Sequence, residues 1–215
     1  MKIIALIVRR HELARAEFRR HYEEVHAPLA LRHFDQFSGY VRNHVAEEIA
    51  GGPAGFDCLT EFWYRDRAAL AGVLAYLESP AAEPIRRDET TFMDKAANVF
   101  FPVEEKIVIA GDAAGAGRKI IMLGARAPGQ PLKLFVRDWE TALAAGLAAP
   151  PRPLRCVHNI AAGTGASPPP WDVVTMLWYA ASFPQLAQRD RPRPGRCLIV
   201  RADQRITRLS PTAPT

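Results

Sequence analysis

Residues 56–64 read FDCLTEFWY, and residues 171–179 repeat this pattern as WDVVTMLWY. Apolar and aromatic side chains stand at both parities of the first stretch, so we expect both faces of this strand to be buried. Two other strand-like pairs match in the same order: KIIALIVRR (2–10) with KIIMLGARA (119–127), and VRNHVA (41–46) with CVHNIA (156–161). Similar segments in one order, at nearly one spacing, indicate an internal repeat.

The repeat predicts two copies of one unit, residues 1–110 and 118–205, joined by the flexible Gly/Ala-rich segment AGDAAGAGR. Apolar periodicity in the first copy predicts the order β-α-β-β-α-β, a ferredoxin-like unit. The expected elements are strand 2–9, helix 14–33, strands 39–47 and 56–64, helices 66–77 and about 80–97, and strand 99–109. Helices cover one face of such a sheet, and the second copy is the natural cover for the other. We therefore predict an α+β fold with tandem ferredoxin-like halves that form a pseudo-dimeric barrel within one chain.

The two copies are not equal. Between Tyr64 and Phe101 there are 36 residues, which is room for a long helix, whereas Tyr179 and Cys197 are separated by less than half that length. This shorter connection holds only SFPQLAQRD (182–190) and a Pro-rich RPRPG. We predict that the second copy has lost most of its second helix and acts as a scaffold, so that any deep polar pocket belongs to residues 1–110.

Composition excludes several functional classes. The net charge is +5 and the pI about 9.4, but the densest basic stretch, RDRPRPGRC (189–197), is broken by prolines and lacks aromatic residues, so we expect no nucleic-acid partner. No apolar run approaches the roughly 20 residues that span a bilayer, and the apolar start MKIIALIVRR is too short for a secretory signal. We expect a cytoplasmic protein without a membrane partner.

The same reading predicts neither a metal nor a cofactor. The three cysteines share no CxxC spacing, which fits reduced thiols. No HExxH motif or compact His/Cys/carboxylate set is present, and the glycine-rich GDAAGAG does not open onto a helix as a nucleotide loop would.

The stretch HYEEVHAPLA (21–30) places a proline inside a helical pattern. Pro28 lacks an N–H, and its ring would clash with the carbonyl of Glu24, so the helix should end or kink around 26–27. Two interpretations remain open for His26: it caps a helix end, or it points into a cavity between helix and sheet. In the second case we expect its polar partner on the strands, with Glu61 or Tyr40 the preferred candidates.

Two neighbouring strands carry further polar candidates. Tyr40, Arg42 and His44 share one face of their strand, and Asp57, Leu59, Glu61 and Trp63 share one face of the next. Because the strands form a hairpin, the two sets are expected side by side. The second copy places Asn159 at the position of His44 and Met176 at that of Glu61, which marks His44 and Glu61 as candidates for function. Asp88 is interpreted as a helix cap or an arginine partner, and His11, His21 and His33 as surface residues.

Five short motifs in order resemble the EthD family, which belongs to the dimeric α+β barrel proteins: FRRHYEEVHAPLA, GYVRNHV, FDCLTEFWY, RRDETTFMDKA and FFPVEEKIV. The resemblance covers about residues 1–110, and the second half is similar to a degenerate copy without His-x-Pro. It implies a dimeric α+β barrel with a pocket between sheet and helices. Some members linked to polyketide pathways are thought to dehydrate or cyclise aromatic intermediates, with the His of His-x-Pro implicated; here this is His26.

These observations lead to one preferred function and two alternatives. The preferred one is an enzyme of the dehydratase, cyclase or isomerase type, which performs cofactor-independent acid–base chemistry on a small hydrophobic or aromatic carbonyl metabolite. His26, Glu61 and His44 are the candidate catalytic residues, and the predicted pocket lining is Tyr22, Tyr40, Trp63 and Phe92. The alternatives are a non-catalytic binding module for a hydrophobic metabolite and a cofactor-free or haem-dependent monooxygenase of the same barrel type. A homodimer is compatible with all three.

Overall fold

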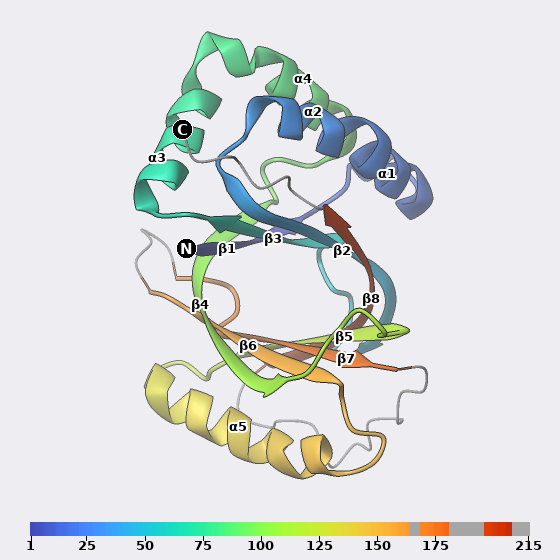
Figure 1. The fold of residues 1–215 in the computed structure, drawn as a ribbon, viewed down its shortest axis with the longest axis vertical. Helices are drawn as coiled ribbons and strands as arrows, with labels where there is room; N and C mark the ends of the chain where they lie inside the picture. The colour runs from blue at the N-terminus through green and yellow to red at the C-terminus, as the bar shows by residue number, and fades with distance from the viewer. Residues whose placement is uncertain (164–167, 181–195, 208–215) are drawn as a thin grey trace. The chain divides into compact units, whose positions relative to one another are not determined.

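The computed structural model describes residues 1–163, 168–180 and 196–207 and shows an α+β fold (Figure 1). The strand order β1-β3-β2-β8-β5-β7-β6-β4 is that of a closed antiparallel barrel. The described residues form two compact units: residues 1–44, 55–100 and 204–207 make one, and residues 45–54, 101–163, 168–180 and 196–203 make the other. Strands β2 (Phe37–Ala50), β4 (Val99–Ala110) and β8 (Arg196–Thr207) each have residues in both units. The predicted α+β class is confirmed.

In the first unit, β1 (Lys2–Ile7) and β2 both pair antiparallel with β3 (Cys58–Tyr64). Helices cover one face of this sheet (Figure 1): α1 (Arg15–His21), α2 (Ala27–His33), α3 (Arg67–Glu78) and α4 (Glu83–Phe92), with a short 3₁₀ turn at Pro80–Ala82 before α4. Alternate strand residues such as Tyr40, Cys58 and Tyr64 point toward these helices and join their apolar cores. The chain order of strands and helices is the one that the periodicity predicted.

In the second unit, β5 (Arg118–Ala125) pairs with both β7 (Val173–Tyr179) and β8, and β7 pairs with β6 (Arg155–Ala161). The helix α5 (Leu132–Ala148) buries Phe135, Trp139 and Leu143 against this sheet. No other helix occurs in the described part of this unit. The segment 182–190, where a remnant of a second helix was predicted, lies outside the described residues.

The helical segment around Pro28 does not break. Residues Tyr22–His26 form one turn of π-helix, η1, between α1 and α2, and the Ala27 N–H donates to the Tyr22 carbonyl five residues back. Pro28 then lies in the first turn of α2, where a missing N–H is tolerated. The expected helix end at 26–27 is therefore wrong, because a π-turn accommodates the proline instead.

None of the helices in the described part of the chain is long and apolar enough to cross a membrane.

Candidate active site

His26 is the last residue of the π-turn, and its side chain faces α4. Its side chain is 9% exposed, and its Nδ1 lies 2.8 Å from Oδ2 of Asp88. Among the described residues, no partner binds its other ring nitrogen, Nε2. The expected strand partner was wrong: the carboxylate comes from a helix, one turn before Phe92 on α4.

Asp88 binds a second histidine. Its Oδ1 lies 2.7 Å from Nε2 of His21, so the carboxylate bridges two imidazoles. Burial alone would raise the pKa of Asp88, but the hydrogen bonds from His26 and His21 lower it below its ordinary value. An ionised carboxylate only accepts hydrogen bonds, so His26 must carry a proton on Nδ1. When His26 is neutral, its Nε2 is therefore a free base.

The π-turn explains how His21 and His26 converge. On a regular α-helix, residues five apart are separated by about 140° around the axis. Across a π-turn, in which hydrogen bonds join residues five apart, they come onto one side. The interpretation of His21 as a surface residue and of Asp88 as a cap or arginine partner is wrong for this reason.

Aromatic rings enclose this polar group. The Phe92 ring stacks on His21 with centroids 4.7 Å apart and lies 5.0 Å from the His26 ring. Tyr22 packs edge-on to His26 at 5.3 Å, and its hydroxyl lies 2.9 Å from the Thr60 hydroxyl on β3. Burial raises the pKa of Tyr22 well above its usual range, which keeps this hydroxyl protonated. The predicted lining residues Tyr22 and Phe92 thus lie beside His26.

A second polar group also borders Tyr22, whose ring is 5.8 Å from that of His44. His44 Nε2 is 2.6 Å from Oε1 of Glu23, which also accepts hydrogen bonds from Nε and Nη2 of Arg42. The Arg42 guanidinium lies 4.4 Å above the Tyr40 ring. His44, Arg42 and Tyr40 therefore share the face toward the helices, as the two-residue period predicted.

The charges of this second group are well defined. Burial opposes ionisation of Glu23, but hydrogen bonds from His44 and Arg42 lower its pKa to about 2. Burial likewise opposes a charge on His44, and the Cys58 thiol and the Glu23 carboxylate outweigh it, raising the pKa of His44 to about 9. His44 is therefore cationic at neutral pH; its buried Nδ1 has no nitrogen or oxygen partner among the described residues, and the Cys58 side chain lies close enough to the ring to raise its pKa. It is a poor base in this state and a good hydrogen-bond donor.

Glu61 is not brought together with His26. It faces the opposite side of the sheet, where Oε2 lies 2.7 Å from Nζ of Lys2 and Oε1 accepts a hydrogen bond from Asn43. Lys2 also lies 4.3 Å above the ring of Trp63, which places Trp63 on this face too. The strand register gives the reason: Tyr40, Arg42 and His44 lie opposite Phe62, Thr60 and Cys58, one residue out of phase with the set that contains Glu61.

The second segment of the chain repeats the contacts that build the sheet. Tyr22 with Thr60 corresponds to Trp139, whose Nε1 donates to Thr175 at 2.8 Å. Lys2 lies over the ring of Trp63, as Lys119 lies over that of Trp178. Arg9 binds Asp57, as Arg126 binds Asp172. The Asn43 side chain donates to the Leu59 carbonyl, as the Asn159 side chain donates to the Val174 carbonyl.

These matches shift the predicted alignment of the two segments by one residue on the second strand. Asn159 corresponds to Asn43, and the position of His44 is taken by Ile160, which lies opposite Val173 as His44 lies opposite Cys58. On the helix, the buried series Phe135, Trp139 and Leu143 matches Phe18, Tyr22 and His26 at the same four-residue spacing. The counterparts of His26 and His44 are thus apolar.

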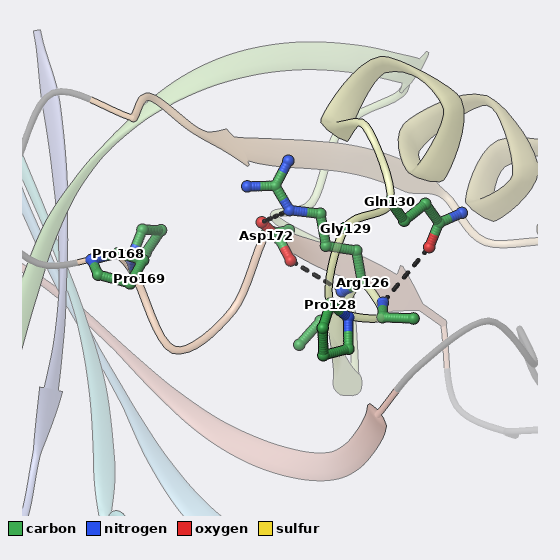
Figure 2. Close-up of a pocket in the computed structure, with 9 residues that line it drawn as sticks. Arg126, Pro128, Gly129, Gln130, Pro168, Pro169 and Asp172 are labelled. Carbon is green, nitrogen blue, oxygen red and sulfur yellow. Dashed lines mark hydrogen bonds and ion pairs between the residues drawn. The ribbon is translucent and has the colours of Figure 1, made fainter.

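Two surface pockets lie away from these groups. One, of about 500 Å³, is lined by residues that include Arg126, Gln130 and Asp172, with Arg126 bound to Asp172 across its wall (Figure 2). The other, of about 340 Å³, lies between residues 10–12 and 90–95. Neither is lined by a predicted site residue, and the larger of the two lies outside residues 1–110, to which the sequence assigned the pocket. No group of three His, Cys, Asp or Glu side chains in the described part of the chain is arranged to hold a metal ion.

Comparison with known proteins supports the family of the first half and the fold of the whole. Residues 10–96 match the EthD domain, which confirms the resemblance for this part of the chain. No curated protein sequence matches significantly. A solved structure described as an anthrone oxidase-like protein shares the fold, with a TM-score of 0.51 and 11% identity over 99% of this chain and 95% of that one. A candidate monooxygenase from Lactobacillus acidophilus NCFM matches 97% of this chain and 95% of its own, at 10% identity and a TM-score of 0.49.

Proposed function

We propose that this chain, with its EthD domain at residues 10–96, is a small enzyme that moves protons on a hydrophobic or aromatic carbonyl compound without a cofactor. The observation that carries the proposal is the buried Asp88–His26 hydrogen bond beside Tyr22 and Phe92. A carboxylate that orients an imidazole inside an apolar site is the arrangement of a general base or acid.

His26 would be the catalytic group in this proposal. Asp88 holds the proton on Nδ1, so Nε2 can take a proton from an acidic C–H next to a carbonyl and return it at another atom. Such a transfer is the step that dehydration, cyclisation and isomerisation have in common. Asp88 would stabilise the imidazolium that forms, as the carboxylate of an acid–base triad does.

His44 would serve as a hydrogen-bond donor and not as a base. The support is its cationic state and its contact with the Tyr22 ring, which His26 also contacts. A buried cationic donor can stabilise negative charge on a carbonyl oxygen when a proton leaves the neighbouring carbon. Glu61 has no place in this proposal, because it lies on the other face of the sheet in an ion pair with Lys2.

A proton-exchange assay tests the proposal without knowledge of the natural substrate. Small aromatic ketones and 1,3-diketones such as benzoylacetone would be incubated in D₂O, and loss of the α-proton signal followed by NMR. We expect exchange above the buffer rate with the wild type, the buffer rate with His26→Leu, and a 10²–10⁴-fold loss with Asp88→Asn, the usual range for an oriented acid–base group. Equal exchange by wild type and His26→Leu would contradict the proposal.

The same assay separates the alternatives. Ligand-induced NMR shifts without exchange would support a binding module. Oxygen uptake with the same ketones, or a haem absorption band on the purified protein, would support a monooxygenase of the same barrel type.

The architectural prediction of tandem ferredoxin-like halves, residues 1–110 and 118–205, is part of the proposal. Its support is the set of paired contacts, Tyr22–Thr60 with Trp139–Thr175 among them. A small hydrophobic ligand, a cytoplasmic location and a homodimer also remain predictions.

A further inference from the structure

Asp88 binds two histidines, His21 and His26, and this sharing affects the proposed role of His26 as a base. Its two oxygens are both occupied, Oδ1 by His21 at 2.7 Å and Oδ2 by His26 at 2.8 Å. The two imidazoles differ in access to water: the side chain of His21 is 29% exposed and that of His26 is 9% exposed. One carboxylate thus connects an outer and an inner histidine.

A simple acid–base dyad does not need the outer histidine. One hydrogen bond from His26 to Asp88 would already fix the ring of His26, and the full charge of the carboxylate would then act on that ring. His21 instead donates a comparable hydrogen bond to the other oxygen, and Thr91 Oγ1 lies 3.3 Å from the same Nε2. The stacked Phe92 ring, 4.7 Å from the ring of His21, holds its plane in this position.

We propose that His21 is a positioning residue, which shares Asp88 with His26 and so limits how strongly the carboxylate holds a proton on the inner histidine. This proposal rests on the proposed acid–base function of His26. Without His21, the undivided charge of Asp88 would favour the imidazolium form of His26. An imidazolium cannot accept a proton, so His26 would act as a base over a narrower range of pH.

The other titratable groups near the cluster are neutral or bound to other partners. Tyr22 on η1, with Tyr40 on β2 and Cys58 on β3, packs in the same apolar core. Tyr22 and Tyr40 are neutral because burial raises the pKa of both phenols. His44, whose ring contacts Tyr22, is bound to Glu23. On α4 itself, Glu89 is bound to Lys95.

The test compares two variants of His21. His21→Phe keeps a ring that stacks on Phe92 but removes the donor to Asp88, whereas His21→Gln keeps an N–H donor near Nε2 and cannot ionise. The first readout needs no substrate: the carboxyl ¹³C signal of Asp88 is titrated by NMR. Because the hydrogen bond from His21 lowers the pKa of Asp88, we expect that pKa to rise by about half a unit to one unit in His21→Phe, the scale of one charge-assisted hydrogen bond. In His21→Gln it should stay near the wild-type value.

The second readout is the pH dependence of α-proton exchange. In His21→Phe the acid limb should move to higher pH with little change of the plateau rate, and His21→Gln should restore the wild-type profile. An unchanged Asp88 titration in His21→Phe, or an equal change in both variants, would overturn the proposal. If the carboxyl titration moves as expected but His26→Leu retains full exchange activity, the sharing of Asp88 is real and the proposed function is what fails.

Discussion

The two segments of this chain, residues 1–110 and 118–205, share several structural contacts and differ where chemistry is expected. Each has an aromatic side chain bound to a strand threonine, a lysine over a tryptophan and an arginine bound to an aspartate. Only the first has His26, which binds Asp88; at the matching helix position the second has Leu143 in its apolar core. What both segments keep builds the sheet, and what one of them adds in polar form is the candidate site.

The largest expected effect comes from making the first segment resemble the second. His26→Leu introduces the side chain found at Leu143 and removes the proposed reacting group. We expect proton exchange on an aromatic ketone to fall at least 10²-fold, the usual contribution of a general base. The thermal midpoint should stay within a few degrees, because the volume is nearly kept. His11→Leu, at a fully exposed histidine, is the control and should leave the exchange unchanged.

The two segments should also respond to pH in opposite ways. The pKa of His44 is raised to about 9, so its stabilising effect is complete below its unfolded value near 6.5 and is lost as pH rises to about 9. Burial lowers the pKa of His158 to about 4, so this residue destabilises the fold as pH falls from 6.5 toward 4. Each effect is on the order of 3 kcal/mol at most.

Urea unfolding across this pH range measures both effects. His44→Gln, which keeps a donor for Glu23, should flatten the loss of stability between pH 6.5 and 9. His158→Asn, which keeps a partner for Thr175, should flatten the loss between pH 6.5 and 4. Variants that leave both slopes as in the wild type would refute the assigned charges.

The shared contacts should have similar energies in both segments. Thr60→Val removes the partner of the Tyr22 hydroxyl, and Thr175→Val removes the partner that the Trp139 N–H shares with Nδ1 of His158. Each leaves a buried polar group unpaired, which costs about 1–3 kcal/mol. Chemical denaturation of the two variants checks this, and a loss confined to one of them would break the equivalence of the segments.

Much of this could be predicted from the sequence because it depends on local periodicity. The strand and helix order, the α+β class and the shared face of Tyr40, Arg42 and His44 follow from the alternation of residues. The partner of His26 could not be predicted in this way, because Asp88 is 62 residues away and reaches it only through packing of α4 on η1. One local signal was available: Pro28 inside a helical pattern is compatible with a π-turn, which would have aligned His21 with His26.

The position of Glu61 failed for a different reason. Both sets of alternate residues were assigned correctly within their own strands. Which set of one strand shares a face with which set of the other depends on the strand register, and the sequence alone does not determine that register. The register places Thr60 and not Glu61 opposite Arg42. A slip of one residue reverses the face of every side chain, so a hairpin with correct strands still gave a wrong site partner.

The smallest effect is expected at the arginine–aspartate pairs. Arg9 and Arg126 are 29% and 37% exposed and bind Asp57 and Asp172. We expect Arg9→Ala and Arg126→Ala to cost about 0.2–1 kcal/mol each, as partly exposed ion pairs do, and to lose part of that effect at high salt. Thermal melts at two salt concentrations measure it. A loss of several kcal/mol in one segment alone would show that the pair has a role the other lacks.

The central claim is that the ligand binds at the polar group of the first segment, His26 with Asp88. A chemical-shift map of the ring and methyl signals in the presence of benzoylacetone tests this claim most directly. We predict concentration-dependent shifts at His26, Tyr22 and Phe92, and none at Leu143 or Trp139. Shifts confined to Leu143 and Trp139, or to the pocket around Arg126 and Asp172 (Figure 2), with His26 unmoved, would contradict it.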